Sequence, residues 1–273
     1  MNNQRPKSEF TDVDQVDTPQ NYVECLDSQH NMDFILIYKQ RARMLLDIRP
    51  GQQILEVGVG TGQDAQEVAK VVGLSGQVIG LDFSQTMVDV AQQRSQGMNL
   101  PVRFVQGDVH LLSFADNTFD RCYADKTFQH LPDPRQALLE MIRVTKPGGL
   151  ILIVDPDHET NVLDTPYPDV TRRFFRFRND GMRQPGIAHQ LYGLFKEYGL
   201  NDVKVEPLTW IATDYETIRP VAHYIEGMRA AQQFGVVSAE EAERWIAYVE
   251  DAIRNDRFFR AMTYFITTGH KPT

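Results

Sequence analysis

A chain of 273 residues with 42% hydrophobic content is long enough for one doubly wound α/β domain with additions, or for two small domains. The formal net charge of −9 argues against a nucleic-acid partner, because binding to phosphate backbones depends on clustered lysine and arginine. Cys25 and Cys122 lie at no metal-ligand spacing, and neither a signal peptide nor a membrane-spanning apolar run is evident, so we expect a cytoplasmic protein with no membrane partner.

The first 48 residues are expected to form a tail and helices that close over a ligand. Residues 1 to about 18 are polar and predict the tail. Helices are expected at 20–28 and at 31–47, where the apolar residues of the second segment form one stripe. The side chains in these helices that are candidates to reach a ligand are Tyr22, Tyr38 and Arg41, although packing aromatics and a solvated arginine are the commoner roles.

The next stretch is a strand that ends in a glycine turn. Residues 53–57 form a short apolar run, and the helical spacing of apolar residues then begins at Gln63. Glycines at alternate positions leave backbone N–H groups open to a ligand beside the positive end of the helix. These glycines are Gly58, Gly60 and Gly62, a G-x-G-x-G spacing that differs from the dinucleotide fingerprint. Glu56 precedes the turn, where a carboxylate can attract a ligand ammonium group.

The following two strands also end in acidic residues. A run at 77–81 ends in Asp82, whose position suits binding of both hydroxyls of a ribose. A run at 102–105 is followed by Gly107 and Asp108. Together with Glu56, these acids suit a ligand that carries an amine, a ribose diol and an exocyclic amino group.

The second half of the chain predicts four more strands and a helical cap. The strands are expected at 119–124, 150–154, 202–207 and 262–267, with the last one pairing antiparallel to its predecessor. The stretch after Val154 predicts a loop of about thirty residues, too long for a simple connection and therefore a lid or a cap. Helical segments at 215–233 and 239–255 would complete this cap, with insertions at about 156–185 and 213–256.

At residues 50–155 the chain resembles the class I S-adenosylmethionine-dependent methyltransferases. Residues 56–62 resemble the first motif of that family, Asp82 its ribose-binding acid, residues 107–109 its adenine-binding segment, and residues 146–149 a further marker. Within the family, Phe119-Asp120 and residues 130–134 are similar to the small-molecule group that includes the ubiquinone and menaquinone C-methyltransferases.

The resemblance implies a doubly wound, seven-stranded Rossmann-like sheet in residues 49–273, mostly parallel with an antiparallel last strand. It implies S-adenosylmethionine as cofactor, S-adenosylhomocysteine as product and a small-molecule methyl acceptor. No metal is expected, and the oligomeric state is not predicted. The cofactor-binding residues it implies are Glu56, Gly58, Gly60, Gly62, Asp82, Phe83, Gly107, Asp108, Val109, Lys126 and Thr127, the last two near the sulfonium.

Two histidines are candidates for a catalytic base. His158 lies in the expected cap and His130 follows the fourth strand, where an imidazole can take a proton from the acceptor. A metal bound by Asp155, Asp157 and His158 is a weaker interpretation, since acidic clusters at strand ends are common. A nicotinamide oxidoreductase and a non-catalytic cofactor-binding protein are the alternatives.

Overall fold

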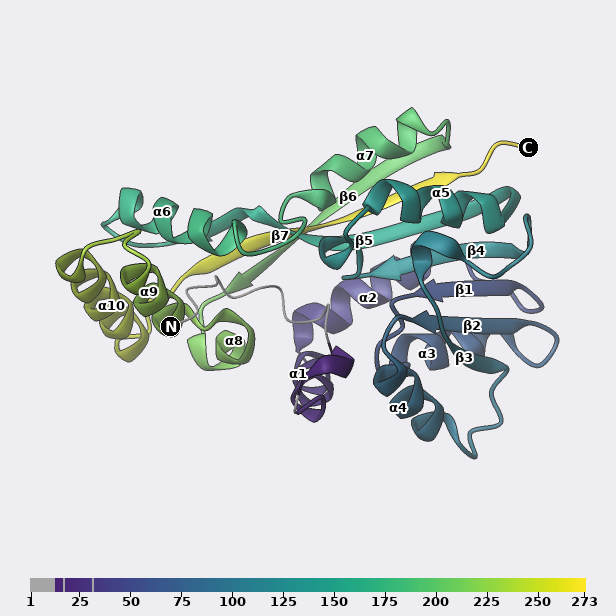
Figure 1. Cartoon of the computed structure of the whole chain (residues 1–273), viewed down its shortest axis with the longest axis horizontal. Helices are drawn as coiled ribbons and strands as arrows, with labels where there is room; N and C mark the ends of the chain where they lie inside the picture. Colours follow the sequence, from purple (N-terminus) through teal and green to yellow (C-terminus); the bar gives the residue numbers. More distant parts are fainter. Residues whose placement is uncertain (1–12, 17, 31) are drawn as a thin grey trace.

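The sheet forms the centre of the molecule. The structure, a computed structural model, describes residues 13–16, 18–30 and 32–273. Seven strands form one sheet in the order β3-β2-β1-β4-β5-β7-β6, with β7 antiparallel to both of its neighbours (Figure 1). The strands are β1 (Gln53–Val57), β2 (Gln77–Asp82), β3 (Val102–Gln106), β4 (Phe119–Asp125), β5 (Thr145–Leu163), β6 (Asn201–Ala212) and β7 (Arg260–His270). The predicted doubly wound sheet with an antiparallel last strand is confirmed.

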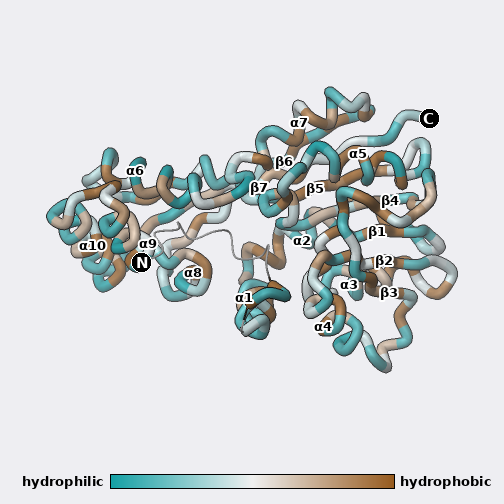
Figure 2. Tube along the Cα trace, in the orientation of Figure 1, coloured by the Kyte–Doolittle hydropathy of each residue, from teal (hydrophilic) through white to brown (hydrophobic). Residues whose placement is uncertain are grey.

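Helices cover both faces of the sheet because the central strands are apolar on both sides. Side chains such as Leu55 and Ile151 pack on one side with α5 (Pro134–Val144) and α7 (Ile187–Glu197). Alternate residues such as Ile54 face the opposite side. The helices on this opposite side are α2 (Asp33–Leu46), α3 (Gln63–Val72) and α4 (Gln85–Ser95). In Figure 2 brown, hydrophobic stretches run through these strands, while the helices alternate brown and teal.

The part of the sheet that helices cover on both faces is called the layered part. The strands β5, β6 and β7 continue beyond it into a helical lobe, visible at the left of Figure 1. The expected long loop after Val154 is wrong, because β5 continues to Leu163 and pairs there with Arg260 of β7. The pairing of β5 with β7 shifts its register at a bulge between Asp157 and Val162 and continues beyond it. Because the side chains of this stretch are polar, a prediction based on apolar runs does not detect the strand. The rest of the expected loop contains a helix, α6 (Pro168–Asn179).

The helical lobe packs around aromatic side chains. It contains α6, α8 (Tyr215–Ala222), α9 (Tyr224–Gln233) and α10 (Ala239–Arg254). Phe174 of α6 and Trp245 of α10 are fully buried, with ring centroids 5.2 Å apart. Their cluster continues into the layered part without a break. The helix expected at 215–233 is divided in two, because His223 adopts a left-handed conformation. The division of the chain into a tail with cap helices at 1–48 and a Rossmann-like domain at 49–273 with cap insertions stays a prediction.

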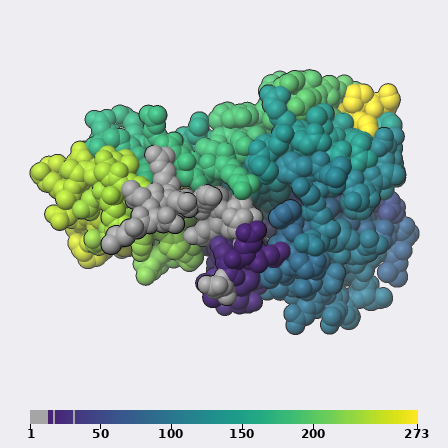
Figure 3. Space-filling view, in the orientation of Figure 1, coloured from purple at the N-terminus to yellow at the C-terminus, as the bar shows by residue number. Residues whose placement is uncertain are grey.

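The N-terminal elements lie at the edge of the sheet where the strands β1 and β2 end. Of the expected tail, residues 1–12 and 17 lie outside the described residues. Asp14, in the short turn η2 (Val13–Gln15), accepts hydrogen bonds from the Ser84 hydroxyl at 2.5 Å and the Gln85 amide at 2.8 Å, at the start of α4. The helix α1 (Gln20–His30) follows, and the purple segment in Figure 3 rests against the blue surface of the layered part.

Candidate active site

The candidate site lies at the carboxyl ends of β1, β2 and β4. A cavity of about 60 Å³ opens there, lined by the glycine turn, the first residues of α3 and the end of β4, and covered by Leu26 and His30 of α1 and by α2. Ligand pockets have volumes of roughly 300–1,000 Å³. As described, the cavity has room for one end of a nucleoside ligand, and α1 covers it.

The glycine turn is shaped by close packing. Gly58, Gly60 and Gly62 all have positive φ, which side-chain-bearing residues rarely adopt. A Cβ atom at Gly58 would lie 2.1 Å from the Thr127 hydroxyl oxygen, and one at Gly62 would lie 2.8 Å from the Cβ of Ala91. No larger side chain fits at either position. The expected open amides are not seen at these glycines, because the amides of Gly58 and Gly62 donate to the carbonyls of Leu81 and Val59 and that of Gly60 donates to Asp82, which holds the turn in shape.

Glu56 brings a carboxylate to the floor of the cavity. It is 3% exposed and accepts a hydrogen bond of 2.6 Å from the Tyr123 hydroxyl. Burial raises the pKa of Glu56 well above its usual value, and the nearby Asp64 carboxylate raises it further. A ligand ammonium group would reverse this effect, since an opposite charge favours the ionised carboxylate.

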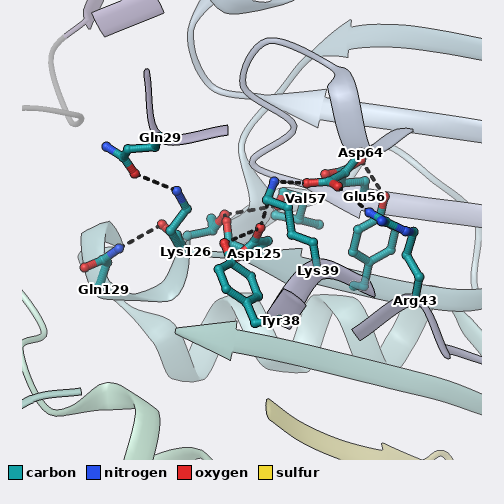
Figure 4. Close-up of polar contacts among 12 residues, drawn as sticks. Gln29, Tyr38, Lys39, Arg43, Glu56, Val57, Asp64, Asp125, Lys126 and Gln129 are labelled. Carbon is teal, nitrogen blue, oxygen red and sulfur yellow. Dashed lines mark hydrogen bonds and ion pairs between the residues drawn. The ribbon is translucent and has the colours of Figure 1, made fainter. Parts of the chain in front are cut away.

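A network of charges joins α2 to the cavity, and sequence analysis missed its centre (Figure 4). The ammonium group of Lys39 contacts the carboxylate of Asp64 and lies 3.2 Å from that of Asp125. The Tyr38 hydroxyl donates to both oxygens of Asp125 at 3.0 Å. Because these residues come from three separate elements, no local motif identifies Lys39 or Asp64. Arg41, a candidate to reach the ligand, instead forms an ion pair with Glu206 of β6.

The predicted ribose and adenine residues lie along the neighbouring strand ends. Asp82 accepts hydrogen bonds from the amides of Gly60 at 2.8 Å and Ser84 at 3.0 Å. Burial raises the pKa of Asp82, and these two amides oppose the increase. The amide of Gly107 donates to the Asp82 carbonyl at 2.9 Å, which fixes β3 beside β2. Phe83 is 68% exposed, so its ring is available to a ligand.

Just after the end of β3, Asp108 and Val109 have different surroundings. The Asp108 carboxylate accepts a 2.9 Å hydrogen bond from the His110 amide and contacts the His110 ring, while Val109 is buried. Asp108 and Val109, like Gly62, Asp82, Phe83, Gly107 and Thr127, do not line the cavity itself. Their assignment to the cofactor stays a prediction.

Lys126 and Thr127 have different surroundings although they are adjacent. The ammonium group of Lys126 lies in the cavity wall and donates to the Gln29 side chain at 2.8 Å. Burial lowers its pKa, which the Asp125 carboxylate partly offsets. The Thr127 hydroxyl faces the backbone instead, 3.2 Å from the Val57 carbonyl and 3.1 Å from the Asp125 carbonyl. Thr127 therefore supports the glycine turn, whereas Lys126 is positioned to contact a ligand.

The two candidate histidines lie on the side of the helical lobe. His158 Nε2 is 2.9 Å from the Gln129 side-chain oxygen, and Gln129 Nε2 donates to the Lys126 carbonyl at 3.2 Å. Burial, together with the charges of Arg178 and Arg260, lowers the pKa of His158 to about 3. Burial likewise lowers the pKa of His130 to about 4. Both imidazoles are therefore neutral at neutral pH, and both are weak bases.

The two acidic side chains that could bind a metal together with His158 each accept hydrogen bonds from other groups. Asp155 accepts from the amides of Phe128 and Gln129, while Asp157 accepts from the His189 amide at 3.2 Å and contacts its ring. Within the described ranges, no three histidine, cysteine or acidic side chains gather in a manner that would hold a metal ion. In the same part of the chain, no helix has the length and apolar character needed to cross a bilayer.

Comparison with known proteins identifies relatives over most of the chain. Residues 55–153 match the family described as "Methyltransferase domain". An uncharacterised 37.1 kDa protein of transposon Tn4556 from Streptomyces fradiae is 34% identical over 249 residues, which cover 90% of this chain and 70% of that protein. The demethylmenaquinone methyltransferase of Bacillus mycoides is 28% identical over 201 residues, covering 67% of this chain and 84% of the relative.

Solved structures show the same fold. Phosphoethanolamine N-methyltransferase 2 of Haemonchus contortus, in complex with phosphomonomethylethanolamine and S-adenosylhomocysteine, superposes with a TM-score of 0.63. The match covers 97% of this chain and 61% of the other at 18% identity, a level at which only the fold is shared.

Proposed function

This chain belongs to the class I S-adenosylmethionine-dependent methyltransferases, and we propose that it transfers the methyl group to a small organic acceptor by in-line displacement. An electron pair on an oxygen, nitrogen or carbon atom of the acceptor attacks the methyl carbon while the carbon–sulfur bond breaks toward sulfur. S-adenosylhomocysteine then leaves with a neutral thioether sulfur, and any proton carried by the attacked atom is lost to solvent. Since the sulfonium is a good leaving group, the protein mainly has to align the reactants and exclude water.

We assign the methionine end of the cofactor to the cavity at the end of β1. Glu56 would bind the ammonium group, and Lys126 would bind the carboxylate. Lys126 suits this role better than Lys39, because Lys39 already pairs with two carboxylates while the ammonium group of Lys126 donates to the neutral side-chain amide of Gln29. Its positive charge is also better placed against a carboxylate than against a sulfonium.

The nucleoside would extend along the ends of β2 and β3. In this arrangement Asp82 binds the ribose, and Asp108 with Val109 and the exposed ring of Phe83 borders the adenine. The amide contacts of Asp82 leave lone pairs for the ribose hydroxyls, because an ionised carboxylate accepts about four hydrogen bonds.

The acceptor would approach from the helical lobe, where His158 and His130 lie. An imidazole with a pKa of about 3 does not retain a proton at neutral pH. His158 would therefore orient the acceptor through a hydrogen bond and pass any released proton on to water.

The single observation that carries the proposal is the buried Glu56 carboxylate in a cavity lined by the glycine turn. The test measures transfer of tritiated methyl from S-adenosylmethionine to a panel of small molecules, beginning with quinone precursors because relatives are named for demethylmenaquinone. Gly58→Ala is expected to abolish transfer, since its Cβ would clash with Thr127.

Gly73→Ala is the matched control, because Gly73 also has positive φ but has open space around its Cβ. It should retain transfer. Cofactor binding without transfer to any acceptor would favour the non-catalytic alternative, and equal loss in both variants would show that the glycine turn has no specific role.

A further inference from the structure

The helical lobe encloses an arginine that lacks a counter-ion. Arg260, the first residue of β7, is 6% exposed, and its Nε and Nη1 atoms have no hydrogen-bond partner within the described residues. Its Nη2 atom makes only long contacts, 3.4 Å to the Asn161 side-chain oxygen and 3.3 Å to the Met262 sulfur. A guanidinium is charged at every physiological pH, and burying it unpaired is unfavourable. Within residues 13–16, 18–30 and 32–273 this buried charge therefore lacks an anionic partner.

A second arginine and an unpaired hydroxyl lie in the same lobe. Arg178 of α6 lies 5.6 Å from the ring centroid of Phe174 and 5.4 Å from that of Tyr224, and it donates to the Ala222 carbonyl. Across 13–16, 18–30 and 32–273, neither Arg178 nor Arg260 forms an ion pair with a carboxylate. The buried hydroxyl of Tyr224 also has no hydrogen-bond partner in these ranges.

The two arginine charges act on the same space. The His158 carbonyl accepts from Asn161 at 2.8 Å and from Asn179 at 3.2 Å; Asn161 is the contact of Arg260, and Asn179 follows Arg178 in α6. Burial is the main cause of the lowered pKa values of His158 and Arg178, and the charge of Arg260 contributes to both. The Arg260 guanidinium is held in place by the ring of Trp210, with 4.8 Å between the guanidinium carbon and the ring centroid. A rigid and positively charged site therefore lies next to the candidate histidine.

A row of aromatic rings links this site to the reaction centre. Trp210 stacks on Phe34 at 5.4 Å, and Phe34 contacts Tyr264 at 5.1 Å. Tyr264 stacks on Tyr38 at 5.1 Å, and the Tyr38 hydroxyl binds Asp125 at the end of β4. Arg260 and Tyr264 lie on one strand, about 13 Å apart along β7 at the usual rise per residue. Tyr38, Trp210 and Tyr264 are buried in the hydrophobic core, so the row connects the two sites through packed side chains.

We propose that the helical lobe binds an anionic acceptor, whose carboxylate or phosphate pairs with Arg260, assisted by Arg178 and the Tyr224 hydroxyl. From Arg260 the acceptor extends toward the end of β4, so that its nucleophilic atom faces the methyl group. This inference rests on the proposed function, because the acceptor has to reach the cofactor.

The first test compares matched anionic and neutral ligands. Calorimetry on the protein loaded with S-adenosylhomocysteine uses 2-naphthoate, biphenyl-4-carboxylate and indole-3-acetate, each beside its amide, and 2-naphthyl phosphate. At least one anion should bind ten times more tightly than its neutral counterpart, and the stronger of the naphthoate and the naphthyl phosphate identifies the anionic group. If no anion binds better than its amide, the inference is wrong, and this comparison requires no variant.

The second test locates the effect. Arg260→Met should remove the anion's advantage, whereas Arg172→Met, an exposed arginine of α6 paired with Asp169, should keep it. Without ligand, Arg260→Met should raise the melting temperature, since it removes an unpaired buried charge. A lower melting temperature together with unchanged anion binding would show a structural arginine and overturn the inference.

The same titrations separate this inference from the proposed function. Both variants should bind S-adenosylhomocysteine as the wild-type protein does, because Arg260 and Arg172 are outside the cofactor cavity. Failure of the wild-type protein to bind S-adenosylhomocysteine would count against the cofactor site instead.

Discussion

Glu56 is the residue whose ionisation responds most directly to cofactor. Burial raises its pKa in the free protein, and the ammonium group of a bound cofactor would lower it again. We therefore predict that binding of S-adenosylmethionine releases a proton and that affinity increases as the pH rises through the raised pKa. Titrations in buffers of different ionisation enthalpy measure the released proton.

Glu56→Gln serves as the matched variant, since a glutamine keeps the shape and can accept from the Tyr123 hydroxyl. It should abolish the proton release and weaken binding by about 1.5–3 kcal/mol, the range for hydrogen bonds to charged groups. Proton release that persists in Glu56→Gln would assign it to another residue.

His158 makes a prediction about acid stability. Its folded-state pKa of about 3 is below the value of roughly 6.5 expected when unfolded, so the unfolded state binds more protons between these values. Stability is therefore full above about pH 6.5 and decreases as the pH falls. Between pH 7.5 and pH 5.0, His158→Gln should lose about 2 kcal/mol less unfolding free energy than the wild-type protein, measured by urea denaturation.

The control is His223→Asn, because His223 is exposed and asparagine tolerates its left-handed conformation. This variant should show the same pH dependence as the wild-type protein. Equal slopes in His158→Gln and the wild-type protein would mean that His158 titrates normally.

At the scale of single elements, α1 covers the cavity with Leu26 and His30. Asp27 pairs with Arg94 of α4 through two bonds of 2.7 Å, and Gln29 accepts from Lys126 at 2.8 Å. We predict that Asp27→Asn accelerates both association and dissociation of S-adenosylhomocysteine severalfold in stopped-flow measurements, because the cover opens more often.

Glu67→Gln is the appropriate control, since it removes an exposed ion pair with Lys70 on α3. It should leave both rate constants unchanged, as exposed pairs contribute little to stability. Unchanged rates in Asp27→Asn would mean that the cofactor enters by another route.

Comparison of the elements with the sequence shows which of them local patterns can predict. The glycine turn and the short strands were predictable, because Gly58 and the apolar run before it are adjacent in sequence. The extension of β5 to Leu163 was not, since its polar residues form a strand only through pairing with β7. Lys39 was missed for the same reason, because its carboxylate partners come from other elements.

At the scale of the whole molecule, the helical lobe and the layered part share one hydrophobic core. Trp245 lies in that core, fully buried, and its indole N–H donates to the Thr171 hydroxyl at 2.9 Å. We predict that Trp245→Ala costs about 3–5 kcal/mol and that unfolding remains a single transition. Far-ultraviolet circular dichroism and binding of S-adenosylhomocysteine, followed together in urea, should show coincident midpoints. Two separate midpoints would mean that the lobe unfolds independently.

The account depends most on the site at the ends of β1 and β2, and calorimetric titration with S-adenosylmethionine and S-adenosylhomocysteine tests it most directly. The wild-type protein should bind both, and Asp82→Asn should weaken binding by about 1–3 kcal/mol through lost hydrogen bonds to the ribose. Asp89→Asn, an exposed acid on α4, should bind as the wild-type protein does. Absence of binding to either ligand, or equal affinity in Asp82→Asn, would contradict the assignment of the site.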